Sequence, residues 1–109
     1  MTMIVFAGEL RRRNPGAVKA FLRAHLEATR WMRENPDRAR AILARHLQLT
    51  AEVARGVNLL RWPADARNNR AMLERLQPLL VEIGMLHRPV PTDRLYDESP
   101  LDEVLAGTR

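Results

Sequence analysis

Two Asn-Pro pairs divide the first half of this chain into helices. They are Asn14-Pro15 and Asn35-Pro36. The Asn side chain can accept a hydrogen bond from a free amide of the first helical turn, and the proline stands where no amide donor is needed. The pairs therefore predict one long helix over residues 15–34 and a second from residue 36 to about residue 46.

Apolar residues recur along the first of these helices at steps of three and four. They are Val18, Phe21, Leu22, His25, Ala28, Thr29 and Met32, and Ala17, Ala20, Ala24 and Trp31 widen the stripe. A helix with so wide an apolar face is expected to be buried on more than one side. On this stripe, His25 is predicted to be a core histidine with its hydrogen bonds satisfied.

The remaining chain predicts shorter elements. Thr50 caps a third helix that runs from residue 51 to about residue 60, and a fourth helix spans about residues 65–83. Pro78 should kink or divide the fourth helix near Glu74, and Gly84 should end it in a left-handed conformation. Short helices are expected over residues 93–96 and 101–105, the second capped by Ser99. The apolar run at residues 3–7 predicts one strand.

These elements predict a mainly α fold, a bundle-like layer of four to six helices with one short N-terminal strand. The chain would form a single domain or fragment. Residues 1–13 are predicted as a strand or arm, residues 14–86 as the main helices, and residues 87–109 as a C-terminal turn with short helices. At 109 residues, one modest core is possible.

Composition excludes several kinds of chemistry. The chain has no cysteine, so disulfides and thiolate-bound metals are impossible. Its net charge is +5, and 17 of its 18 basic residues are arginine, but only Arg11-Arg12-Arg13 forms a cluster. We interpret most arginines as solvated helix faces. No apolar run is long enough for a membrane span, and no signal peptide is recognisable, so the chain as written is expected in the cytoplasm.

The polar residues do not form a recognisable catalytic set. His25, His46 and His87 lack the spacing of a metal site, and there is no phosphate-binding glycine loop or nucleophile elbow. We interpret the acidic pairs Asp97-Glu98 and Asp102-Glu103 as helix-start charges. We therefore predict no enzyme, cofactor or metal. The set Trp31, Met32 and Trp62 could line a ligand pocket, although core packing is the favoured role.

Residues 41–57 read like a helix-turn-helix. Leu47 and Leu49 flank the turn, and a would-be recognition helix starts at Thr50. Gln48 occupies the turn position that favours glycine, and the second helix offers few donors to bases. A small DNA-binding or regulatory protein is therefore the alternative interpretation. Its DNA-contacting residues would be Thr50, Glu52 and Arg55.

The order of several short sequence words resembles a known family. These words are Val18-Lys19-Ala20-Phe21-Leu22-Arg23-Ala24, Glu27-Ala28-Thr29-Arg30-Trp31, Glu34-Asn35-Pro36-Asp37, Leu47-Gln48-Leu49-Thr50, Ile83-Gly84-Met85-Leu86, Leu95-Tyr96-Asp97 and Ser99-Pro100-Leu101-Asp102-Glu103-Val104-Leu105. Together they resemble the C-terminal part of the solute-binding proteins of nitrate/sulfonate/taurine-type ABC importers and their thiamine-precursor-binding relatives. The resemblance covers nearly the whole chain.

This resemblance implies a type II periplasmic-binding-protein fold and a place outside the cytoplasmic membrane, periplasmic or extracellular. It also implies two partners, an ABC permease and a small solute of the nitrate, sulfonate, taurine or pyrimidine-like kind. The export signal, the first lobe and most of the second lobe of that family are missing here. No ligand-binding residue can be assigned by the resemblance, and the segment alone should bind solute weakly or not at all.

A severed helical layer would expose apolar surface. The first and fourth helices should carry faces that the missing sheet would cover. We therefore expect a homo-oligomer formed through apolar helix faces, with the strand at residues 3–7 paired or exchanged between copies. A stand-alone helical oligomer of unrelated function is the third interpretation.

Overall fold

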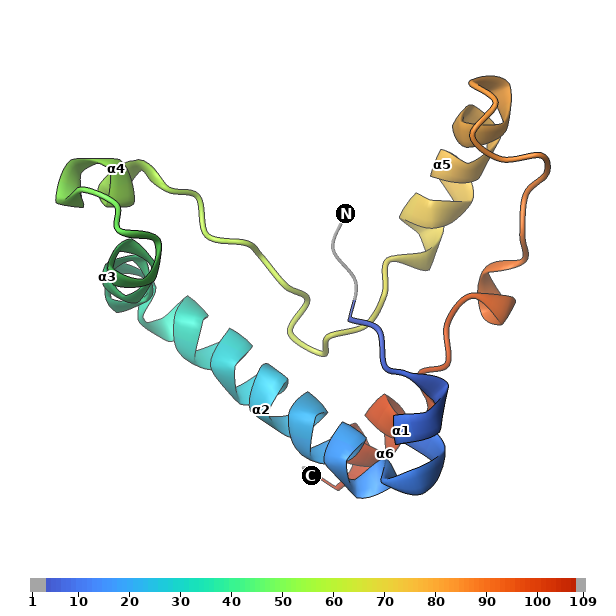
Figure 1. The fold of residues 1–109 in the computed structure, drawn as a ribbon, viewed down its shortest axis with the longest axis horizontal. Helices are drawn as coiled ribbons and strands as arrows, with labels where there is room; N and C mark the ends of the chain where they lie inside the picture. Colours follow the sequence, from blue (N-terminus) through green and yellow to red (C-terminus); the bar gives the residue numbers. More distant parts are fainter. Residues whose placement is uncertain (1–3, 108–109) are drawn as a thin grey trace. The chain divides into compact units, whose positions relative to one another are not determined.

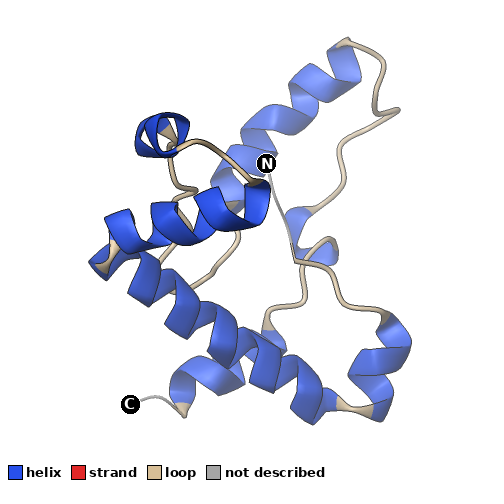
Figure 2. Cartoon of the chain, turned by 60° about the vertical axis from the view of Figure 1, so that its left-hand side comes forward, coloured by secondary structure: helices blue, strands red, loops and turns tan. Residues whose placement is uncertain are grey.

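The computed structural model describes residues 4–107, and every regular element in that range is a helix (Figures 1 and 2). The elements are α1 (Gly8–Arg13), α2 (Pro15–Glu34), α3 (Pro36–Leu47), α4 (Ala51–Gly56), α5 (Arg70–Glu82), the 3₁₀ helix η1 (Thr92–Arg94) and α6 (Ser99–Ala106). The prediction of a mainly α fold with four to six helices is confirmed.

The chain folds as two compact units. One contains the chain up to Lys19 together with the chain from Arg67 onward, and the other contains Ala20–Ala66. The boundary falls inside α2, so the predicted segment of main helices over residues 14–86 is shared between the units. In the second unit α3 packs against α4, and in the first α5 packs against η1. None of the described helices is long and apolar enough to cross a bilayer.

The Asn-Pro pairs start helices as predicted, but only one asparagine caps. The side-chain oxygen of Asn14 accepts a hydrogen bond from the Ala17 amide at 3.1 Å. Asn35 instead donates from its side-chain amide to the carbonyl of Trp31, at 3.0 Å. The same carbonyl also accepts from the Asn35 main-chain amide at 2.9 Å, so Asn35 closes the end of α2 instead of capping a free amide of α3.

The predicted N-terminal strand is wrong for residues 4–7, which are irregular; Met3 lies outside the described residues. A strand needs a neighbour to accept its ladder of hydrogen bonds, and this part of the chain has none. The next residues form α1, which the prediction of an arm over residues 1–13 missed. Glu9 in its first turn and three arginines in its last turn suit the helix dipole.

The third and fourth helices are shorter than predicted, because residues 57–69 are irregular. Thr50 caps α4 by accepting from the Val53 amide, as expected. The helix then stops at Gly56, where Val57 is extended and its carbonyl accepts from the Arg40 guanidinium at 3.2 Å. The fourth helix begins only at Arg70, since the Asn69 side chain accepts from the Met72 amide at 2.9 Å.

Pro78 does not divide α5, which continues through it as one helix to Glu82. The predicted stop at Gly84 is confirmed by its φ of +75°. The Gly84 amide donates to Val81 and the Met85 amide to Leu80, which is the Schellman pattern of a helix end.

The C-terminal elements differ slightly from prediction. The segment expected as a helix over residues 93–96 is η1, and α6 begins at Ser99 rather than at Leu101. Ser99 does not cap α6. Its amide and hydroxyl both donate to the Asp97 carboxylate, at 3.1 and 2.6 Å.

Burial along α2 is one-sided, contrary to the prediction of a helix covered on more than one side. Val18, Leu22 and Thr29 are buried, whereas Phe21 is 50% exposed. Apolar side chains of α3 and α5 are also exposed. They are Ile42 and Leu47 on α3, Leu79 on α5 and Ile83 at the C-cap of α5. The core of the described residues is correspondingly small, and its apolar members are Val18, Leu22, Ala39, Ala54, Leu73, Leu101 and Val104.

Gln48 holds a left-handed backbone, with φ of 55°, at the end of α3. A side chain with a Cβ costs about 1 kcal/mol in this conformation, and glycine avoids that cost. We predict that Gln48→Gly raises the free energy of unfolding by about 0.5–1 kcal/mol in urea denaturation followed by circular dichroism. Gln48→Ala is the control and should change little. Equal stability of the Gly and Ala variants would contradict the prediction.

Candidate functional site

The acidic pairs around α6 are engaged by cations of the same unit. Asp97 pairs with Arg11, and Glu103 accepts from Lys19 at 2.7 Å. Asp102 accepts from Arg67 at 2.6 Å. The sequence interpretation of these carboxylates as helix-start charges missed their main role. They tie α1, the start of α2 and the segment before α5 to the C-terminal helix.

Glu98 is the centre of this network. One of its oxygens accepts from the amide and the side chain of Asn68, both at 3.0 Å, and the other lies 3.4 Å from Arg67 and from Arg70. Its side chain is only 12% exposed. Burial raises the pKa of this carboxyl, but the two Asn68 donors and the charges of Arg70 and Arg67 together bring the pKa below its ordinary value of 4.5.

The predicted helix-turn-helix exists as α3, a turn and α4. Thr50, Glu52 and Arg55 are all exposed. The Thr50 hydroxyl is occupied as the cap of α4, and Glu52 stands in the first turn of that helix. A six-residue helix gives Arg55 as its only basic side chain. All three residues are accessible, but Arg55 is the one cationic donor among them for phosphates or bases.

The histidines do not meet. His25 lies on α2, His46 in the last turn of α3, and His87 in the loop after α5. No group of three metal-ligating side chains is found among residues 4–107. His25 is not the satisfied core histidine that was predicted, because its Nε2 is buried without a hydrogen-bond partner in the described chain. Its ring contacts aromatics instead: Phe21 stacks at 6.5 Å and Trp62 meets it edge-on at 5.0 Å between centroids.

The aromatic set considered for a pocket is divided. Trp62 belongs to the His25 contact, whereas Trp31 lies under the guanidinium of Arg38, 5.5 Å from the ring centroid. Trp31, Met32 and Trp62 are each partly buried. These contacts agree with a packing role for both tryptophans.

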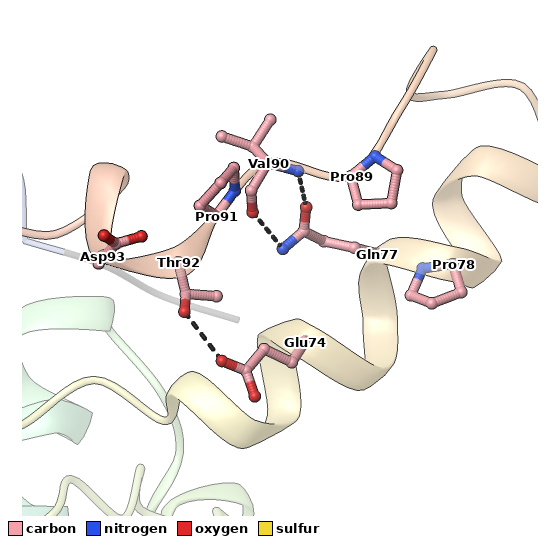
Figure 3. A pocket seen from close by; sticks show the side chains of 8 residues that line it. All are labelled: Glu74, Gln77, Pro78, Pro89, Val90, Pro91, Thr92 and Asp93. Atoms are coloured by element: carbon pink, nitrogen blue, oxygen red, sulfur yellow. Dashed lines mark hydrogen bonds between the residues drawn. The ribbon is translucent and has the colours of Figure 1, made fainter.

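An open groove of about 470 Å³ lies between α5 and the segment that leads into η1 (Figure 3). Its lining is formed by Glu74, Gln77, Pro78, Pro89, Val90, Pro91, Thr92 and Asp93. The buried Gln77 side chain donates to the Val90 carbonyl at 2.9 Å and accepts from the Val90 amide, as a neighbouring strand would. Thr92 donates to Glu74 at 2.9 Å. These bonds hold the proline-rich segment along the helix.

Sequence reasoning did not find this groove. The sequence predicts only a turn at the start of residues 87–109, and Gln77 gives no signal because a lone glutamine on a helix is ordinarily solvated. One usable clue was present. Prolines on either side of Val90 prevent that segment from forming its own helix and leave the Val90 amide to bond elsewhere.

The Glu98 network predicts an acid-sensitive first unit. Since the folded pKa of Glu98 is depressed, its contribution to stability is present above the unfolded pKa and is lost as the pH falls through the folded pKa. We expect Glu98→Gln to lower the free energy of unfolding by about 1–3 kcal/mol at pH 7. Below about pH 4.5, the free energy of unfolding should decrease less with falling pH in the variant than in the wild type. Urea denaturation at several pH values measures both effects.

The matched control is Glu27→Gln, because Glu27 is exposed on α2. It should leave both the stability and its pH dependence nearly unchanged. A Glu98→Gln variant with the wild-type acid profile would show that another carboxylate governs the transition.

No protein-family model, no curated protein and no solved structure matches this chain.

Proposed function

We propose that this chain is a non-catalytic helical interaction segment whose uncovered apolar faces bind a protein surface. In the context of its sequence resemblance, it would be the C-terminal helical layer of a solute-binding component of an ABC importer. Taken alone, it would cover those faces with a second copy of itself. The single observation that carries the proposal is that more large apolar side chains are exposed than are buried in the core of the described residues.

The accessible surface supports an incomplete core. The structure exposes 8772 Å², whereas a compact monomer of this mass exposes about 6200 Å². Two separate compact globules of half the mass would together expose only about 7400 Å². The excess is therefore at least about 1300 Å², which exceeds the roughly 800 Å² that each partner buries in an interface of standard size.

The exposed apolar side chains are distributed over both units. In the first unit they include Leu79 on α5 and Ile83, its C-cap residue four positions later, which are 50% and 58% exposed. In the second unit they include Leu47 and Val53, at the end of α3 and in α4, which are 59% and 54% exposed. Apolar residues repeated along one helix face favour packing against another protein surface over permanent contact with water.

The first experiment is the absolute mass in solution by light scattering coupled to size exclusion, at low and high salt. A salt-insensitive dimer or larger species is expected, because apolar burial is not screened by ions. A clean 12.5 kDa monomer at high concentration would contradict self-association.

A pair of α5 variants localises the contact. Leu79→Glu with Ile83→Glu should shift the species toward monomer while circular dichroism retains its helical signal. Arg75→Glu, at an exposed polar position of the same helix, is the charge-matched control and should leave the mass unchanged. If both variants remain oligomeric, the contact lies on another apolar face, and the Leu47 and Val53 surface is tested next.

DNA binding by the α3–α4 pair is the second candidate, supported by the capped turn at Thr50 and the exposed Arg55. Fluorescence anisotropy with duplex DNA tests it. This function requires binding that weakens steeply with salt and is lost in Arg55→Ala. Glu52→Gln should strengthen such binding, because it removes a negative charge from the surface that faces phosphate. Binding that is absent at low salt would eliminate this candidate.

A further inference from the structure

We propose that the groove between α5 and residues 89–93 is a binding site for an arginine side chain presented by a peptide or protein partner. The proposal is independent of self-association. It rests on three properties of the groove: an apolar proline lining, carboxylates at one end, and side-chain polar groups of which only acceptors are left available.

The lining provides an apolar surface for an aliphatic stem. Pro78 of α5 and Pro89 of the facing segment lie toward one end of the groove in Figure 3, and Pro91 and Val90 line its wall. The Gln77–Val90 hydrogen bonds fix that wall in place. An arginine stem packs well on such surfaces while its charged end reaches polar groups.

The side-chain donors of the groove and the Val90 amide are already used. The Gln77 side-chain NH₂ donates to the Val90 carbonyl, and the Val90 amide donates to the Gln77 side-chain oxygen. The Thr92 hydroxyl donates to one carboxylate oxygen of Glu74. The Asp93 carboxylate forms no hydrogen bond or ion pair with the described chain. The groove can therefore accept hydrogen bonds from a ligand but has no free side-chain donor for one.

The Glu74 carboxylate keeps an acceptor oxygen for a ligand. Thr92 donates to one of its two oxygens, and no hydrogen bond or ion pair within the described chain engages the other. The Asp93 carboxylate adds a second negative charge.

A guanidinium matches this arrangement better than other groups. It is always charged, carries five donors in a planar fork and has no acceptor that the groove would leave unpaired. An ammonium group offers only three donors around a compact point charge, and an acidic or neutral ligand would meet unpaired carboxylates. Charge complementarity and donor count therefore both select arginine.

The test is an NMR titration of the full chain with acetyl-arginine-amide. Amide resonances of Val90, Thr92 and Asp93 should shift saturably, because they lie along the groove. Acetyl-citrulline-amide, which has nearly the same shape without the charge, should shift none of them. Acetyl-lysine-amide should bind more weakly. Equal shifts with citrulline or lysine, or shifts that are absent with arginine, would overturn the proposal.

Variants decide whether the shifts arise in the groove. Glu74→Gln combined with Asp93→Asn should weaken arginine binding about tenfold or more, since two charge-assisted bonds are lost. Glu82→Gln, on the same helix but outside the groove, is the matched control. If the double variant unfolds, Asp93→Asn alone is used. A Val90 amide resonance at its wild-type position before arginine is added shows that the wall of the groove is intact. Unchanged affinity in the folded variants would contradict the proposal.

Discussion

The largely covered carboxylate of Glu98 is the interaction on which the first unit depends. One of its oxygens accepts from the main-chain and side-chain amides of Asn68, and the other pairs with Arg67 and Arg70. Lys19 and Arg11 attach the start of α2 and the end of α1 to neighbouring carboxylates. The apolar core is too small to fix these segments alone, so hydrogen bonds and ion pairs set their positions.

The same shortage of core has a functional consequence. A chain that orders its helices with polar contacts leaves much of their apolar surface free, as on α3 and α5. Contiguous exposed apolar faces mark interaction sites on soluble proteins. The proposed interaction segment would account for both the strong helical pattern and the weak burial.

Proline has two roles in α5 and the segment that follows. Pro78 leaves the Glu74 carbonyl without its helical partner, and Pro89 and Pro91 keep the facing segment extended. Gln77 then replaces the missing strand neighbour of Val90 with a side-chain amide. The groove is a by-product of these local constraints.

Local signals in the sequence determined most helix starts and one helix end. Proline at Pro15 and Pro36, the cap at Thr50 and the left-handed Gly84 act through bonds within a few residues, so they can be read without a fold. Only tertiary structure decided how much of the predicted stripe of α2 is buried, which cations pair with Glu98, and that the Gln77 side chain bonds to Val90. These contacts join residues far apart in sequence, and no local pattern records which distant partner a side chain will meet.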